Sequence, residues 1–196
     1  MSGSAASAKS SAAPAPESPA QSFVIRPSRE ADMAAVHRIY AHHVMHGFGS
    51  FEEEPPDLAE LMRRRAEYLS RRLPYLVAEL DGRIVGYAYA GPYRTRSAYR
   101  FTVEDSVYVA PDAMGRGVGS RLLAEVIARA EAAGMRQMIA VIGDSANLGS
   151  IRLHERLGFT RAGVFVAVGW KGERWLDSVL MQRALGPGDR AAPGGP

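Results

Sequence analysis

The stretch VYVAPDAMGRGVGSRLL, residues 107–123, joins an apolar run, a proline, three alternating glycines and the start of a helical pattern. Gly115, Gly117 and Gly119 allow positive φ angles and let the backbone lie close to a ligand. A helix N-terminus presents unpaired backbone N–H groups and the positive end of the helix dipole. A strand, a glycine loop and a helix in this order therefore predict a site for a phosphate group.

Two common phosphate motifs do not fit this loop. A Walker loop requires a lysine after the last glycine, and none follows here. A dinucleotide-binding loop reads G-x-G-x-x-G, whereas the third glycine here comes one position early. Arg116 and Arg121 could add charge-assisted contacts to an anion. From the loop alone, a glycine-rich turn without any ligand is an equal alternative.

The elements around the loop alternate between helical and strand patterns. The expected strands are 23–27, 74–80, 83–90, 100–110, 137–142, 163–170 and 174–185, and the expected helices are 29–45, 55–72, 119–133 and 145–157. Asp81-Gly82 predicts a hairpin between the second and third strands. Because helices interleave with strands, we expect an α/β or α+β sandwich around one mixed sheet.

Composition limits the classes of protein. The 196 residues suit one domain, expected over 22–185, with an Ala/Ser/Pro-rich tail over 1–21 and a flexible tail over 186–196. The net charge of +3 is too small to predict nucleic-acid binding, and no apolar run is long enough for a membrane helix. Cysteine is absent, which excludes disulfides and thiolate sites and fits a cytoplasmic protein.

The glycine loop and its downstream sequence resemble the GNAT superfamily of acetyl-CoA-dependent N-acetyltransferases. The family pattern is Gln/Arg-x-x-Gly-x-Gly/Ala after a strand, followed by a later helix that carries Asn; here the segments are MGRGVG and VIGDSANLGSIRLHERLGF. YAYAGPY, SVYVA and RWLD are similar to the phosphinothricin acetyltransferase-like branch, over about residues 23 to 183. Met114 departs from the pattern, because the family usually has Gln or Arg there.

The resemblance implies a central mixed, mostly antiparallel twisted sheet flanked by helices, and acetyl-CoA as co-substrate. The pantetheine arm would lie along the backbone of Val107, Tyr108 and Val109. The pyrophosphate would lie over 115–120, which comprises Gly115, Arg116, Gly117, Val118, Gly119 and Ser120. Asn147, with Ser150 near the same helical face, would contact the cofactor. The resemblance also implies a homodimer, and it implies no bound metal.

Attack of an amine on a thioester needs a base, because an alkyl ammonium near pKa 10 is almost fully protonated at neutral pH. Glu104 matches the family's position for this base, and its neighbour Asp105 points to the opposite face of the strand. The simpler alternative for Glu104 is a solvated carboxylate on an edge strand.

His154 is the second candidate for the chemistry. It lies seven and four positions after Asn147 and Ser150, on one helical face. The superfamily often has a tyrosine here that protonates the leaving thiolate, and the phosphinothricin branch has histidine. His154 could protonate the thiolate, assist deprotonation of the amine, or simply pack against the sheet.

An amino-acid substrate also needs a partner for its carboxylate. Arg94 and Arg96 precede the catalytic strand, and arginine suits bidentate carboxylate binding. Phe51 is the candidate aromatic contact, and Glu52 follows it where the branch has a basic residue. That departure places phosphinothricin itself in doubt and leaves methionine sulfoximine or sulfone open.

Three other functions compete with acetylation of a small amino-acid analogue. The enzyme could acetylate another amine, such as a polyamine, an antibiotic or a protein N-terminus. The chain could be a silent acetyl-CoA-binding module, although Glu104 and His154 argue against that. A nucleic-acid-binding domain lacks support, since the RRR at 63–65 fits a solvated helix face.

Overall fold

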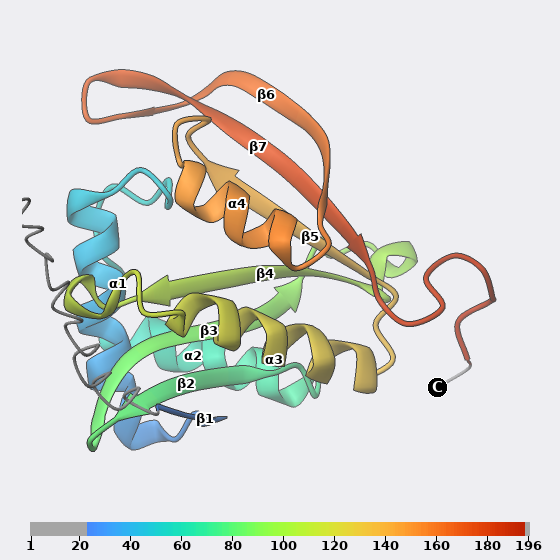
Figure 1. Cartoon of the computed structure of the whole chain (residues 1–196), viewed down its shortest axis with the longest axis horizontal. Helices are drawn as coiled ribbons and strands as arrows, with labels where there is room; N and C mark the ends of the chain where they lie inside the picture. The colour runs from blue at the N-terminus through green and yellow to red at the C-terminus, as the bar shows by residue number, and fades with distance from the viewer. Residues whose placement is uncertain (1–22, 195–196) are drawn as a thin grey trace, which may run out of the picture.

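The computed structural model describes residues 23–194, which form one seven-stranded sheet with helices on both faces (Figure 1). The order of strands is β1-β2-β3-β4-β5-β7-β6, and β4–β5 is the only parallel pair in this part of the chain. The strands are β1 (Val24–Pro27), β2 (Tyr75–Leu80), β3 (Arg83–Pro92), β4 (Thr102–Val109), β5 (Gln137–Gly143), β6 (Thr160–Lys171) and β7 (Arg174–Ala184). The predicted mixed, mostly antiparallel sheet is confirmed.

The helices follow the predicted order with shifted ends. They are α1 (Met33–His46), α2 (Leu58–Ser70), α3 (Val118–Ala132) and α4 (Leu148–Arg156), and a 3-10 turn at Glu30–Asp32 precedes α1. Helix α4 begins three residues later than predicted, because Asn147 is its N-cap and its side chain accepts a hydrogen bond from Ser150 N. Helix α2 begins after Asp57, whose side chain accepts from Glu60 N.

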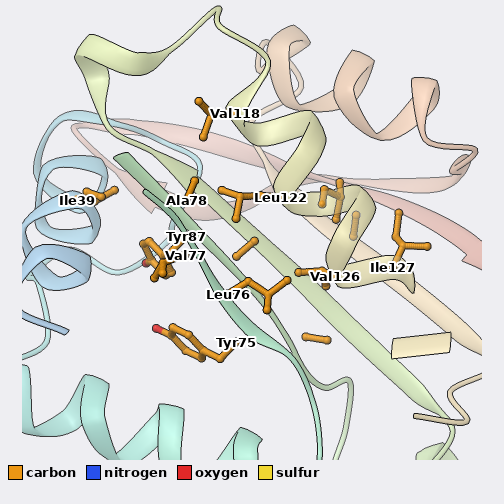
Figure 2. Close-up of a cluster of buried hydrophobic side chains, with 14 of the residues drawn as sticks. Ile39, Tyr75, Leu76, Val77, Ala78, Tyr87, Val118, Leu122, Val126 and Ile127 are labelled. Atoms are coloured by element: carbon orange, nitrogen blue, oxygen red, sulfur yellow. The ribbon is translucent and has the colours of Figure 1, made fainter. Parts of the chain in front are cut away.

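Two apolar layers sandwich the sheet (Figure 2). Leu122 and Val126 of α3 pack toward one face, where Leu76 and Ala78 of β2 project. Tyr75 and its neighbours project from the opposite face, toward α1 and α2. This alternation follows from the two-residue period of a strand, and it lets adjacent residues of β4 face two different environments.

Strands β4 and β5 pair over only three positions before they separate. The last paired residues are Glu104 and Ile139. Beyond them, β4 remains paired with β3 as far as Val109, and β5 remains paired with β7 as far as Gly143. The sheet therefore opens between β4 and β5, and each strand presents a backbone edge to the opening.

The hairpin of β6 and β7 covers the loop between α1 and α2. Lys171 Nζ is buried and donates to Ser50 O at 2.8 Å, and the Ser50 hydroxyl lies 3.0 Å from Tyr40 Oη. Arg174 pairs with Asp144 and lies 4.0 Å above the ring of Phe48. These contacts tie the 47–54 loop to the end of β5.

The end of β5 requires a glycine. A Cβ atom on Gly143 would lie 2.3 Å from Phe48 O, so only glycine allows the 47–54 loop to pass at this distance. The 47–54 loop therefore contacts the strand edge through backbone.

The ends of the chain only partly fall within the described residues. The predicted N-terminal tail over 1–21 lies outside them. Residues 186–194 form no helix or strand, and Arg136 donates to the carbonyls of Ala191 and Ala192 at 2.8 Å. None of the helices between residues 23 and 194 is long and apolar enough to cross a bilayer.

Candidate active site

The glycine loop has the backbone geometry that the sequence predicts. Gly115 and Gly117 have φ angles of +74° and +78°, and a Cβ on either would meet nothing within 4 Å. Gly119 differs, because it lies in the first turn of α3, where its Cβ would contact Val109 at 3.4 Å. The loop thus leaves open space at the N-terminus of α3, where the first backbone N–H groups lack intrahelical acceptors.

A cleft of about 840 Å³ runs from this loop into the opening between β4 and β5. All the predicted cofactor-binding residues except Arg116 line it, together with residues 140–143 of β5. The predicted residues in its wall are Val107, Tyr108, Val109, Gly115, Gly117, Val118, Gly119, Ser120, Asn147 and Ser150. The structure therefore brings the loop, the strand edge and the start of α4 to one site.

The backbone of β4 faces this cleft at Val107 and Val109. Ala110 N donates to Val85 O on β3, so the preceding carbonyl, Val109 O, points the other way, into the opening. His43 Nε2 donates to Val109 O at 2.8 Å. Val107 is two residues away and has the same orientation. An extended ligand could therefore hydrogen-bond to this edge as an added strand.

Glu104 lies on the face of β4 opposite Asp105. Its partner in β3 is Gly91, where a Cβ would lie 3.3 Å from the ring of Tyr68 in α2. Burial, together with the negative charge of Asp105, raises the pKa of Glu104 to about 7, and the positive charge of Arg94 acts in the opposite direction. Glu104 is not part of the cleft wall, but it is the last residue of β4 that pairs with β5.

His154 is buried and paired with Asp105. Its Nε2 lies 3.0 Å from Asp105 Oδ2, and its Nδ1 lies 2.7 Å from Ser150 O. Burial by itself lowers the pKa of His154, but the hydrogen bond and charge of Asp105 outweigh it and raise the pKa above its ordinary value. Both residues line the cleft.

Two residues of this site were missed by the sequence analysis as functional candidates. Asp105 was placed on the far face of β4 without a role, although the same two-residue period brings it beneath α4 and beside His154. His43 lies on α1, and no sequence signal points from this helix to the carbonyl of Val109, sixty-six residues away.

The predicted substrate residues are less tightly grouped. Arg94 stacks on Tyr93 at 5.1 Å and acts electrostatically on Glu104. Arg96 is exposed at the start of a 3-10 turn, with no hydrogen bond to its side chain among those described. Phe51 lies against the end of β5 and against β6, as the short distances to Gly143 and Gly169 show. Of the two predicted arginines, Arg94 is therefore the one whose positive charge lowers the pKa of Glu104.

Three further features complete the surroundings. Met114 is 52% exposed at the start of the loop and lines the cleft. Arg121, a candidate anion contact, instead lies 4.3 Å above the ring of Phe23. Glu52 pairs with Arg64 at 2.7 Å, so this departure from the branch pattern has a partner within the fold. No group of three possible metal ligands occurs among residues 23–194.

Comparison with known proteins agrees with this geometry. The acetyltransferase (GNAT) family model matches residues 34–159. A phosphinothricin N-acetyltransferase of Alcaligenes faecalis is 56% identical over 86% of each chain. An L-methionine sulfoximine/L-methionine sulfone acetyltransferase of Salmonella typhimurium is 41% identical over 87% of this chain and 98% of its own. The chain belongs to the GNAT family of acetyltransferases.

A solved structure shows the same fold. The crystal structure of a GNAT superfamily phosphinothricin acetyltransferase from Sinorhizobium meliloti in complex with AcCoA aligns with a TM-score of 0.85. It is 44% identical, and the alignment covers 88% of this chain and 93% of that one. The predicted family and enzyme class are confirmed.

The raised pKa of Glu104 makes a prediction about stability. The folded protein retains a proton on Glu104 up to about pH 7, whereas the unfolded chain releases it near the ordinary value of 4.5. The free energy of unfolding should therefore fall between pH 5 and pH 8, and Glu104→Gln should reduce that fall by about 1–3 kcal/mol. Urea unfolding at both pH values measures the difference. Glu125→Gln, which changes an exposed carboxylate on α3, should keep the parent's pH dependence.

Proposed function

We propose that this protein transfers the acetyl group of acetyl-CoA to the α-amine of a small amino-acid analogue of the phosphinothricin, methionine sulfoximine or methionine sulfone type. The observation that carries the proposal is the cleft between β4 and β5, with a phosphate-binding loop at one end and Glu104 where the strands separate. The names of the relatives support the substrate class. Acetyl-CoA is a co-substrate, and no metal takes part.

The chain has groups suited to each part of such a ligand. Gly115 and Gly117 leave room for the pyrophosphate beside the N-terminus of α3, where backbone N–H groups and the helix dipole favour an anion. The Val107 and Val109 backbone can bind the amide groups of the pantetheine arm. Asn147 and Ser150 bound the cleft at the start of α4.

Glu104 is the general base of the reaction. A carboxylate with a pKa of about 7 is ionised in part at neutral pH and is basic enough to accept a proton from an ammonium group. The amine then forms a bond to the thioester carbonyl carbon, the carbon–sulfur bond breaks, and its electron pair leaves with the sulfur as a thiolate. The nitrogen releases its second proton as the amide forms, and the thiolate takes up a proton directly from it or through solvent. Direct transfer of this kind needs no enzyme-bound acetyl group, in agreement with the absence of cysteine.

Arg94 binds the carboxylate of the acceptor. Its guanidinium is exposed to solvent, and its positive charge lowers the pKa of Glu104. A carboxylate bound to Arg94 places an α-amine within a short distance of Glu104, because the two groups are attached to the same carbon. A polyamine or other plain amine lacks this anchor and is the main competing acceptor.

A second copy of the chain is the proposed protein partner. Large apolar side chains are exposed on the β6–β7 hairpin: Phe165, Val166, Val168, Trp170 and Trp175. The two tryptophan rings lie 5.3 Å apart as a cross-strand pair. Exposed apolar groups of this size mark interaction surfaces, and two-fold symmetric dimers are by far the commonest homo-oligomers.

The glycine loop can be tested by calorimetry. Gly117→Val places a branched side chain where the phosphates approach and should weaken acetyl-CoA binding at least tenfold. Gly134→Val is the matched control, because Gly134 also has a positive φ angle and open space around its Cβ, but lies at the other end of α3. Unchanged affinity in a folded Gly117→Val protein would contradict the role of the loop.

The base can be tested by kinetics. Glu104→Gln keeps the size of the side chain and removes its basicity, so kcat should fall by ~10²–10⁴ at neutral pH. Acetyl-CoA binding should persist, since Glu104 is not part of the cleft wall. The variant should recover activity at high pH, where free amine becomes abundant. A parent-like kcat at pH 7 would rule out Glu104 as the base.

The substrate class can be tested with a pair of acceptors. Methionine sulfone and its decarboxylated amine differ only in the carboxylate. The parent should prefer the acid, and Arg94→Ala should reduce that preference through a higher KM for the acid. Arg72→Ala, which removes an exposed arginine between α2 and β2, is the control. Equal kcat/KM for both acceptors in the parent would favour a plain-amine acetyltransferase.

The dimer can be tested by sedimentation. Trp175→Glu places a charge in the apolar patch of the hairpin and should convert a dimer to a monomer. Val24→Glu changes a similarly exposed apolar residue on β1, at the opposite edge of the sheet, and should leave the dimer intact. A parent protein that sediments as a monomer would refute the proposal.

A further inference from the structure

Asp105 and His154 form a pair that is almost completely closed off from solvent. Their side chains are 2% and 3% exposed, and the two polar atoms lie 3.0 Å apart. The ring of Phe159 closes the pair from another side, at 5.0 Å and nearly perpendicular to the imidazole. Asp105 Oδ1 is also buried and has no hydrogen-bond partner among residues 23–194. Within this part of the chain, His154 is the group that compensates the charge of Asp105.

The hydrogen bonds determine where the protons of His154 are. A backbone carbonyl can only accept, so the 2.7 Å contact with Ser150 O requires a proton on Nδ1. An ionised carboxylate also only accepts, so while Asp105 is ionised the contact with it requires a proton on Nε2. His154 is then an imidazolium and Asp105 a carboxylate, and the pair has no net charge. Neither nitrogen has a lone pair with which to accept a proton from a substrate.

The pair lies directly behind Glu104 in the sheet. Asp105 follows Glu104 in β4 and projects from the opposite face, toward α4. Arg94, from the segment after β3, also acts on Glu104, and Glu104 in turn raises the pKa of Tyr68 in α2. A buried charge one residue away acts strongly on Glu104, because little water screens it.

We propose that the Asp105–His154 pair is a charge-balancing and positioning element behind β4 that fixes the pH range in which Glu104 accepts the amine proton, while neither member exchanges a proton with the substrate. The inference rests on the proposed role of Glu104 as base. It replaces the sequence-based hypothesis that His154 protonates the leaving thiolate, because both N–H groups of His154 are already donated within the fold.

The two members act on Glu104 in opposite directions. Without the charge of His154, the buried carboxylate of Asp105 stands uncompensated and opposes ionisation of Glu104. Without Asp105, burial keeps His154 neutral, and the repulsion that Asp105 exerts on Glu104 disappears. A purely structural pair would instead lower activity in both variants and leave the pH profile in place.

The experiment measures kcat against pH at saturating acetyl-CoA and methionine sulfone in four proteins. His154→Gln should move the acid limb of the profile to higher pH by roughly one unit, and Asp105→Asn should move it to lower pH. The double variant should follow Asp105→Asn, since no charge remains behind the strand. Glu125→Gln is the control for removal of a distant carboxylate. The acid limb of its kcat profile should lie at the same pH as in the parent.

Other outcomes overturn the inference. Shifts of the same sign in both single variants, or no shift in either, would refute the charge-balancing role. A uniform loss of kcat at all pH values in His154→Gln but not in Asp105→Asn, with the acid limb in place, would restore His154 as a proton donor. Circular dichroism shows whether each variant is folded. If His154→Gln does not fold, Asp105→Asn and the double variant still test the direction in which the acid limb shifts.

Nitrogen NMR of ¹⁵N-histidine-labelled protein tests the pair independently of turnover. Both ring nitrogens of His154 should be protonated at pH 7 in the parent, and one should lose its proton in Asp105→Asn. An unprotonated ring nitrogen in the parent would overturn the inference. If the acid limb of the kcat profile persists in Glu104→Gln, Glu104 is not the base, and the proposed function fails rather than the description of the pair. The NMR result still reports the protonation of His154 in that case.

Discussion

The separation of β4 from β5 after Glu104 and Ile139 is the constraint on which the rest of the structure depends. Three paired positions hold the two strands parallel, and after them each strand keeps its partner on the outer side only. Backbone groups of β4 therefore face an opening that a ligand can enter. The glycine loop lies at the far end of this opening, at the start of α3, so the cleft extends from the strand edge to the loop.

The two-residue period of β4 then divides the site into two sides. Glu104 lies on the face of the sheet that α2 covers, where burial raises its pKa, and Asp105 lies on the opposite face, toward α4. One strand thus presents the proposed base on one face and the Asp105–His154 pair on the other, toward the cleft. The electrostatic link between them is short because they are neighbours in the chain.

The β6–β7 hairpin limits the site from outside the opening. Lys171 binds the carbonyl of Ser50, and Arg174 lies on the ring of Phe48, so the 47–54 loop is fixed against the cleft from the far edge of the sheet. Asp177 adds a second connection, since its carboxylate accepts from Ala167 N in the β6 irregularity and from Ser145 before α4. The exposed tryptophans of the same hairpin place the proposed dimer surface next to these contacts.

The sequence by itself determined the order of elements, the mixed sheet and the glycine loop, because these depend on local periodicity and on positive φ angles, and it offered Glu104 through the family resemblance, a choice that stays a prediction. It placed the start of α4 three residues too early, because a cap depends on one side-chain hydrogen bond. The separation of the strands, the pairing of Asp105 with His154 and the contact of His43 with Val109 were decided by tertiary structure alone. Each of these features depends on residues at least 35 positions apart in the sequence. Only burial and packing of the whole chain determine which distant groups meet.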